Sequence, residues 1–175
     1  MHCLVCHSES RCGAVRSLQA GVHRAAAGGL AVSFLVEGEL ERLRIPAPQP
    51  SRIAARLWEH SCCEIFVARP GLPAYHEFNL SPSGEWAAHA FERYREGGML
   101  ADARLDPRIA VRRGAGTLEL DALIRPPEDL GGEKLLIGLA AVIEAADGSL
   151  SYWALRHPPG RPDFHHRDAF ALELE

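Results

Sequence analysis

The sequence predicts an all-β protein, a single antiparallel β-sandwich of the jelly-roll or immunoglobulin-like kind with about ten or eleven short strands. Apolar and polar residues alternate over many short segments, turn residues separate these segments, and none has the periodicity of a long amphipathic helix. A parallel α/β fold would need crossover helices, which the sequence lacks. The 175 residues fit one domain spanning 1–175.

The first strands are expected to form a hairpin. Residues 13–25 and 30–36 have strand-like patterns, and the glycine pair at 28–29 is typical of the turn between them. A further short extended segment is expected at 40–45. The proline-rich segment 46–50 then predicts an extended external loop, because proline cannot continue a helix.

The central region, 57–98, gathers aromatic, acidic and histidine residues, and alternation predicts strands within it. Residues 64–68 form a buried run, and residues 75–80 follow it after a turn rich in proline and glycine. Residues 85–94 fit either a strand or a short helix, and we favour a strand that carries Trp86, Ala88 and Ala90 on one side.

The C-terminal half repeats the same pattern. A loop is expected between the pairs Pro126–Pro127 and Gly131–Gly132. Further strands are predicted at 108–113, 117–124, 135–143, 150–155 and 170–174.

Composition excludes several classes of partner. The net charge of −4 offers no basic surface for nucleic acid or an anionic membrane, and no apolar run reaches the length of a membrane span. The N-terminus lacks the basic and apolar regions of a signal peptide. We therefore expect a cytoplasmic protein.

The five cysteines do not form a recognisable disulfide framework, because their number is odd and Cys62 and Cys63 are adjacent. Reduced thiols are expected. Cys3 and Cys6 with His7, and Cys12 nearby, match the spacing of zinc thiolates and of c-type haem attachment. The position at the extreme N-terminus, without a signal peptide, argues against haem attachment there.

Two carboxylates are expected to face the same side of the central strands. Alternation places Tyr75, Glu77 and Asn79 on one face, and Glu64 joins them if segments 64–68 and 75–80 pair. Such a pair suits the acid and base of a glycosidase-type hydrolase, a cation site, or outward positions in solvent. All three interpretations stand at this point.

Each of the three tryptophans is either part of the core or a flat surface on which a sugar ring stacks. Trp58 is the most exposed candidate, because it adjoins the proline-rich loop and Glu59. Arg95 is a candidate bidentate hydrogen-bond donor to a ligand, or a partner of Glu92 or Glu96.

A second polar cluster lies near the C-terminus. Residues 157–168 contain three histidines and two aspartates, which suit a transition metal or the capping of turns. The metal candidates are His165, His166 and Asp168. The sequence contains no nucleophile elbow, phosphate-binding loop or H-E-x-x-H motif.

Three segments resemble conserved blocks of the bacterial DOMON-like proteins, a group in the superfamily of DOMON domains and family 9 carbohydrate-binding modules. They read LWEHSCCEIFV, YHEFNLSPSGEWAAHAFERYREG and AAVIEAADGSLSYWALRHPPGRPDFHH. The resemblance spans nearly the whole chain. It implies a β-sandwich that binds carbohydrate or haem.

The resemblance also implies roles for individual residues. In sugar-binding relatives, a stacking Trp precedes the E-I-F strand and an acid within that strand binds hydroxyls, which implies Trp58 and Glu64 here. Trp153 is then the candidate for the opposite side of a stacking clamp. Haem-binding relatives hold iron with Met and His, for which the candidates here are Met99 together with His157, His165 or His166.

Taken together, these observations predict a non-catalytic domain that binds a small ligand, most simply a carbohydrate or glycan-derived molecule. The alternatives are a haem-binding redox domain, a carboxylate-based hydrolase, and a module that binds another protein. The predicted ligand-binding residues are Trp58, Glu64, Tyr75, Glu77, Asn79, Arg95, Trp153, His157 and His165.

Overall fold

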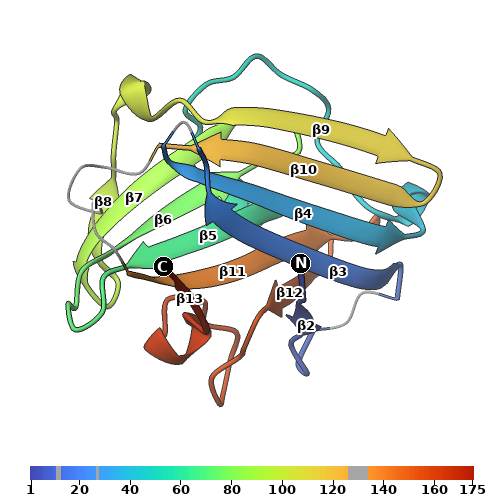
Figure 1. Cartoon of the computed structure of the whole chain (residues 1–175). Helices are drawn as coiled ribbons and strands as arrows, with labels where there is room; N and C mark the ends of the chain where they lie inside the picture. The colour runs from blue at the N-terminus through green and yellow to red at the C-terminus, as the bar shows by residue number, and fades with distance from the viewer. Residues whose placement is uncertain (11–12, 27, 126–133) are drawn as a thin grey trace.

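Two antiparallel sheets face each other in the computed structural model, which describes residues 1–10, 13–26, 28–125 and 134–175 (Figure 1). The five-stranded sheet has the order β1 (His2–Cys3), β3 (Val15–Arg24), β4 (Leu30–Gly38), β10 (Thr117–Ile124), β9 (Arg108–Gly114). The eight-stranded sheet has the order β2 (Val5–Cys6), β12 (Leu150–Ala154), β11 (Leu135–Glu144), β5 (Cys62–Ala68), β6 (Tyr75–Leu80), β7 (Trp86–Arg93), β8 (Glu96–Met99), and β13 (Leu172–Leu174) also pairs with β11. The predicted antiparallel sandwich is confirmed.

Most predicted strands lie where the alternation placed them, and the favoured strand at 85–94 is confirmed as β7. The described residues form thirteen strands, more than predicted, because β1, β2 and β8 are too short to show a pattern. The predicted extended segment at 40–45 is wrong, because Leu40–Arg42 form a 3-10 turn, η1, and Leu43 makes one isolated bridge to Ala145. The loop predicted between 126 and 132 lies outside the described residues.

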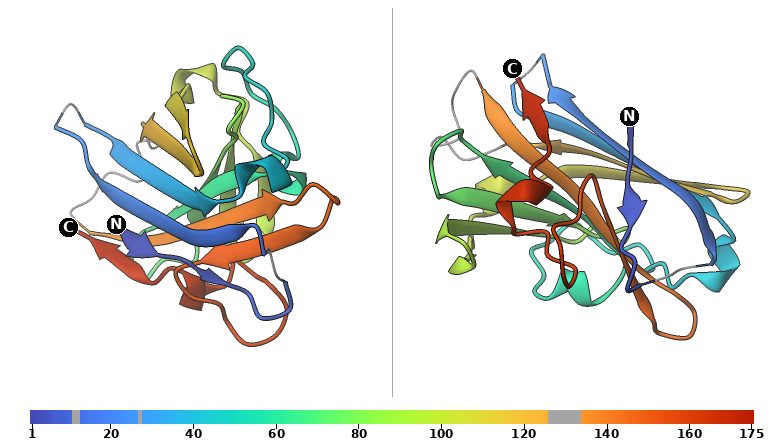
Figure 2. Two further views of the ribbon diagram at one scale, coloured as in Figure 1. Left: turned by 90° about the vertical axis from the view of Figure 1, so that its right-hand side faces the viewer. Right: turned by 90° about the horizontal axis from the view of Figure 1, so that it is seen from below.

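Figure 2 shows the two sheets as two layers. Alternate side chains of both sheets fill the space between these layers. Leu18, Phe34 and Leu120 from the smaller sheet are buried in one cluster with side chains of the larger sheet. Ile65 and Phe78 are two of those side chains. Burial of such apolar side chains stabilises the fold by roughly 1.5–3 kcal/mol each.

The outer face of the larger sheet carries a second apolar cluster, because the C-terminal segment folds back over it (Figure 2). Phe66 and Tyr75 on the sheet pack against Phe164 and Phe170 of that segment. Gly138 allows this close packing, since a Cβ there would lie 3.1 Å from Phe170 Cδ1. Strands β5 and β6 are therefore buried on both faces.

Within the described residues the helical elements are single 3-10 turns, including η2 (Leu57–Glu59), η3 (Ala103–Leu105) and η5 (Arg167–Ala169). None of the helices in the described ranges has the length and apolar character needed to span a membrane.

Candidate ligand-binding site

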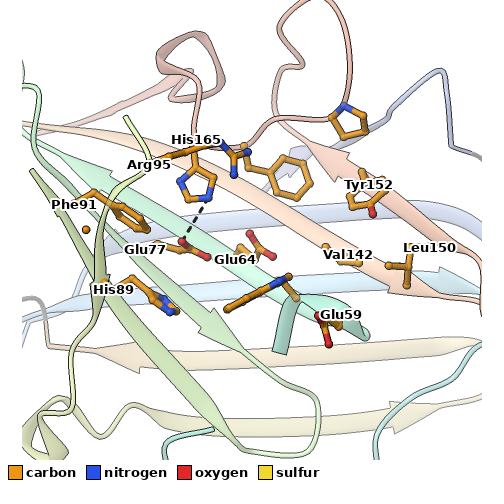
Figure 3. A pocket seen from close by; sticks show the side chains of 15 residues that line it. Glu59, Glu64, Glu77, His89, Phe91, Arg95, Val142, Leu150, Tyr152 and His165 are labelled. Carbon is orange, nitrogen blue, oxygen red and sulfur yellow. Dashed lines mark ion pairs between the residues drawn. The ribbon is translucent and has the colours of Figure 1, made fainter. Parts of the chain in front are cut away.

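A cavity of about 610 Å³ opens on the outer face of the larger sheet. Side chains of β5, β6, β7, β11 and β12 line it from below, and η2, the β7–β8 turn and the C-terminal segment line its sides (Figure 3). The volume lies within the range of small-molecule sites. The lining includes five of the predicted ligand-binding residues, namely Trp58, Glu64, Glu77, Arg95 and His165.

Glu64 and Glu77 share one face of the sheet because their strands pair antiparallel. Glu64 lies opposite Asn79, and Phe66 lies opposite Glu77, so the two carboxylates are diagonal neighbours in the register. Their residues are only 3% and 5% exposed, and both line the cavity (Figure 3). The predicted pairing of the two segments is thus confirmed, whereas the interpretation as solvated outward positions is wrong.

The two carboxylates differ in their hydrogen bonds. Asn79 Nδ2 donates to Glu77 Oε1 over 2.7 Å, while Glu64 has no hydrogen-bond or ion-pair partner in the described part of the chain. Burial, and then the charge of Glu77, raise the pKa of Glu64 well above its ordinary value of 4.5. Burial also raises the pKa of Glu77, against the hydrogen bond from Asn79.

A hydrogen-bonded chain holds His165 over Glu77. The Arg95 backbone N–H donates to the Tyr75 hydroxyl over 3.0 Å, and that hydroxyl shares a second hydrogen bond of 2.9 Å with His165 Nδ1. The other ring nitrogen, His165 Nε2, lies 3.7 Å from Glu77 Oε2. Burial lowers the pKa of His165 to about 4, so the ring is neutral near pH 7.

The Tyr75 hydroxyl is expected to contribute measurably to stability. In Tyr75→Phe, His165 Nδ1 and the Arg95 N–H lose their partner inside a largely buried site, so unfolding in urea should show a loss of about 1–3 kcal/mol. Tyr94→Phe is the matched control, since the exposed Tyr94 hydroxyl donates to Asp163 at the surface and water replaces that bond. Equal, negligible losses in both variants would contradict this role of Tyr75.

Aromatic rings form a continuous row from the opening of the cavity inward. Trp58 is 41% exposed, and its ring meets His89 edge-on at 5.7 Å between centroids. His89 stacks on Phe91 at 6.2 Å, and Phe91 stacks on Tyr75 at 4.8 Å. The neighbouring Leu57 is buried and anchors η2, which leaves the Trp58 side chain at the opening.

Arg95 lies at the side of the cavity in the turn between β7 and β8. Its positive φ of 56° gives the left-handed backbone that this turn needs. Its guanidinium Nη2 lies 2.9 Å from Asp163 Oδ1 of the C-terminal segment. The alternative role of Arg95 as a partner of Glu92 or Glu96 is wrong, because Arg95 pairs with Asp163 and Glu96 pairs with Arg93.

Four predicted ligand-binding residues do not line the cavity, namely Trp153, His157, Tyr75 and Asn79, and these placements are corrected. Trp153 is buried between the sheets, where its Nε1 donates to Ser151 Oγ over 3.0 Å. Alternation along β12 sends Tyr152 to the cavity in its place. His157 instead lies beside the N-terminal strand, with its Nε2 2.7 Å from the Val5 carbonyl and its ring edge-on to His7.

Tyr75 and Asn79, also predicted to bind ligand, lie behind the lining residues. They hold His165 and Glu77 by the hydrogen bonds described above. Their places in the structure make them positioning residues.

The predicted metal ligands do not converge. His166 Nδ1 accepts a hydrogen bond from the Asp168 backbone N–H and caps η5, so these side chains serve the turn. In the part of the chain that the structure describes, no three His, Cys, Asp or Glu side chains are grouped to hold a metal ion. This includes Cys3, Cys6 and His7, while Cys12 lies outside that part.

Several lining residues were not predicted, namely His89, Phe91, Leu150, Tyr152 and Phe164. For His89 and Phe91 the signal was present, since a strand with Trp86, Ala88 and Ala90 on one side places them on the other. No local pattern marks Phe164, because its position depends on how the C-terminal segment folds back.

The fold and the cavity define a β-sandwich with a ligand-sized site on the outer face of one sheet. One solved structure with this fold is a protein from Bacteroides uniformis described provisionally as carbohydrate-binding, with a TM-score of 0.69 and 17% identity over 99% of this chain and 84% of that one. Another is a family 9 carbohydrate-binding module from Caldicellulosiruptor kristjanssonii in complex with glucose, with a TM-score of 0.53 and 10% identity over 91% and 75% of the two chains. No protein-family model and no curated protein matches the sequence.

Proposed function

We propose that this protein is a non-catalytic saccharide-binding domain and that the cavity holds the sugar. The observation that carries the proposal is the combination of a half-exposed Trp58 ring at the opening with two buried carboxylates, Glu64 and Glu77, inside. The C–H face of a pyranose stacks on an indole, and carboxylate oxygens accept hydrogen bonds from its hydroxyls. Both requirements are met on one side of one sheet.

Two further observations support the proposal. The sandwich fold is shared with a family 9 carbohydrate-binding module, and the segments that resemble DOMON-like proteins contribute the carboxylates and Trp58. We therefore also propose membership of the DOMON-like group. Glu64 lines the cavity, and its carboxylate oxygens have no hydrogen-bond partner in the described chain. They are therefore available to accept a hydrogen bond from a ligand hydroxyl.

Haem is less well supported as a ligand. Of the three candidate histidines, His165 lines the cavity, and its Nδ1 is already hydrogen-bonded to the Tyr75 hydroxyl. Met99 is 47% exposed and does not belong to the lining. The site residues thus favour a polar, ring-shaped ligand.

Tryptophan fluorescence tests this proposal with an internal control. Trp58 is 41% exposed, while Trp86 and Trp153 are 2% and 8% exposed, so acrylamide should quench Trp58 selectively. A saturating sugar that stacks on Trp58 should remove that quenchable component. Trp58→Phe should lack the component from the start and bind the sugar at least about tenfold more weakly, with little change in thermal stability. Binding that leaves the quenching of Trp58 unchanged would contradict the proposal.

A further inference from the structure

The two carboxylates inside the cavity have no contacting cation in the described chain. Glu64 makes no ion pair there, and Glu77 contacts the neutral Asn79 amide and faces the neutral His165 ring. Buried carboxylates in proteins are normally paired with a cation or bound to a metal. Glu64 and Glu77 therefore lack the positive charge that buried carboxylates normally contact, and a bound ligand would have to supply it.

The other charged groups around the cavity are already paired. Arg95 lies 2.9 Å from Asp163, and Glu59 accepts a hydrogen bond from Arg56 Nε over 2.9 Å. The pKa of His89 is lowered by burial, which keeps its ring neutral near pH 7. Glu64 and Glu77 remain as the acidic groups that line the cavity without a contacting cation, and the more distant charge of Arg95 only opposes the rise in the pKa of both.

The surroundings suit an organic cation better than a metal ion. A calcium ion takes six to eight oxygen ligands, whereas the described residues group no three acidic, cysteine or histidine side chains around one position. The lining instead contains the rings of Trp58, Phe91, Tyr152 and Phe164. Aromatic faces attract ammonium groups, and more strongly when the site is desolvated.

We propose that the saccharide recognised by this cavity carries a protonated amine, as 2-amino-2-deoxy sugars do, and that its ammonium group lies between Glu64 and Glu77. This inference rests on the proposed saccharide function and specifies the class of sugar. The sugar ring stacks on Trp58, and the ammonium group supplies the positive charge that the two carboxylates lack.

Binding of an amino sugar should change the protonation of Glu64 and Glu77, whereas binding of a neutral sugar should not. An ammonium group beside Glu64 and Glu77 lowers their raised pKa values, so the complex releases protons that the free pair held. The affinity for the amine therefore falls as the pH falls through those raised pKa values. The other titratable or charged groups that line the cavity or interact electrostatically with the pair are Glu59, Cys62, Cys63, Tyr75, His89, Arg95 and His165.

Calorimetric titration of the full chain near neutral pH tests this inference with four probes: D-glucosamine, D-glucose, N-acetyl-D-glucosamine and cyclohexylamine. We expect glucosamine to bind at least about tenfold more tightly than glucose or N-acetylglucosamine, because a charge-assisted hydrogen bond replaces a neutral one. A second titration about two pH units below the pKa of the amine, where the free amino sugar is already protonated, should show proton release with glucosamine and none with glucose when two buffers of different ionisation enthalpy are compared.

Substitutions of the two carboxylates provide a second test of the inference. Glu64→Gln and Glu77→Gln should bring the affinity ratio of glucosamine to glucose to about one, while Glu119→Gln, the same charge change on the smaller sheet, should leave the ratio unchanged. The proton release of the unmodified protein supplies the test if a variant does not fold.

The outcomes separate the two proposals. If glucose and N-acetylglucosamine bind as tightly as glucosamine, the saccharide function stands and the amine inference is overturned. If cyclohexylamine binds and no sugar does, the site is an amine site and both proposals are overturned. If none of the four probes binds, the amine inference is overturned, and a wider panel of sugars tests the saccharide function.

Discussion

Glu64→Gln is expected to weaken saccharide binding and to stabilise the fold. Glu64 is 3% exposed and has no hydrogen-bond or ion-pair partner within the described residues. Its negative charge therefore destabilises the folded protein as long as no ligand is bound. The amide removes that charge while keeping the shape. We expect a gain of about 1–3 kcal/mol near pH 8, or roughly 2–4 °C in Tm per kcal/mol, and an affinity loss of at least about tenfold.

The pH dependence of this gain follows from the direction of the pKa shift. The pKa of folded Glu64 is raised above its ordinary value of 4.5, so the folded state holds the proton to higher pH than the unfolded state does. The fold loses stability as the pH rises through the raised pKa, and below about 4.5 the two states are protonated alike. The gain from Glu64→Gln should therefore shrink as the pH falls from 8 towards 4.5.

Urea unfolding at several pH values measures this effect, and Glu119→Gln is the control. Glu119 lies on the smaller sheet, 42% exposed at the side chain, and pairs with Arg112, so its removal should change stability by less than about 1 kcal/mol. A Glu64→Gln variant that loses stability at high pH would contradict the assignment of Glu64 as an unpaired buried charge.

Phe66→Ala is expected to detach the C-terminal segment from the sheet. The Phe66 ring lies 5.7 Å from Phe170, 6.5 Å from Phe164 and 5.2 Å from His165, so it joins the sheet to the segment that closes one side of the cavity. Its truncation should cost about 3–5 kcal/mol. Saccharide binding should be lost with it, because Phe164 and His165 line the site.

Limited trypsin digestion distinguishes this local effect from general destabilisation. The C-terminal segment offers Arg156 and Arg167 as cleavage sites, since trypsin does not cut the bond between Arg161 and Pro162. In Phe66→Ala the rate of cleavage at these bonds should exceed the rate of global unfolding. Phe78→Ala removes a ring of equal size from the opposite face of the sheet, so its cleavage should follow global unfolding. Equal cleavage patterns in the two variants would contradict a docking role for Phe66.

Alternation along single strands was sufficient to predict much of the site. The segments 64–68 and 75–80 were expected to pair and to carry Glu64 and Glu77 on one face, and the register confirms this. Such predictions succeed because side-chain direction in a strand depends only on neighbouring residues. The exposure of Trp58 was also favoured correctly, from the polar and proline-rich sequence around it.

The remaining features depend on contacts between distant segments. Strand β12 is covered on both faces, since the C-terminal segment packs over its outer side, so hydrophobicity does not separate Trp153 from Tyr152. The same fold-back sets His165 over Glu77 and takes His157 to the N-terminal strand. These placements follow from tertiary packing and leave no local pattern in the sequence.

A titration of the unmodified protein with a panel of neutral and amino monosaccharides and disaccharides, followed by calorimetry, tests the central claim most directly. The account predicts at least one sugar that binds, with an affinity that falls at least about tenfold in both Trp58→Phe and Glu64→Gln and is unchanged in Glu119→Gln. A panel without any binder, or a sugar whose affinity is the same in all three variants, would contradict the assignment of this cavity as a saccharide site.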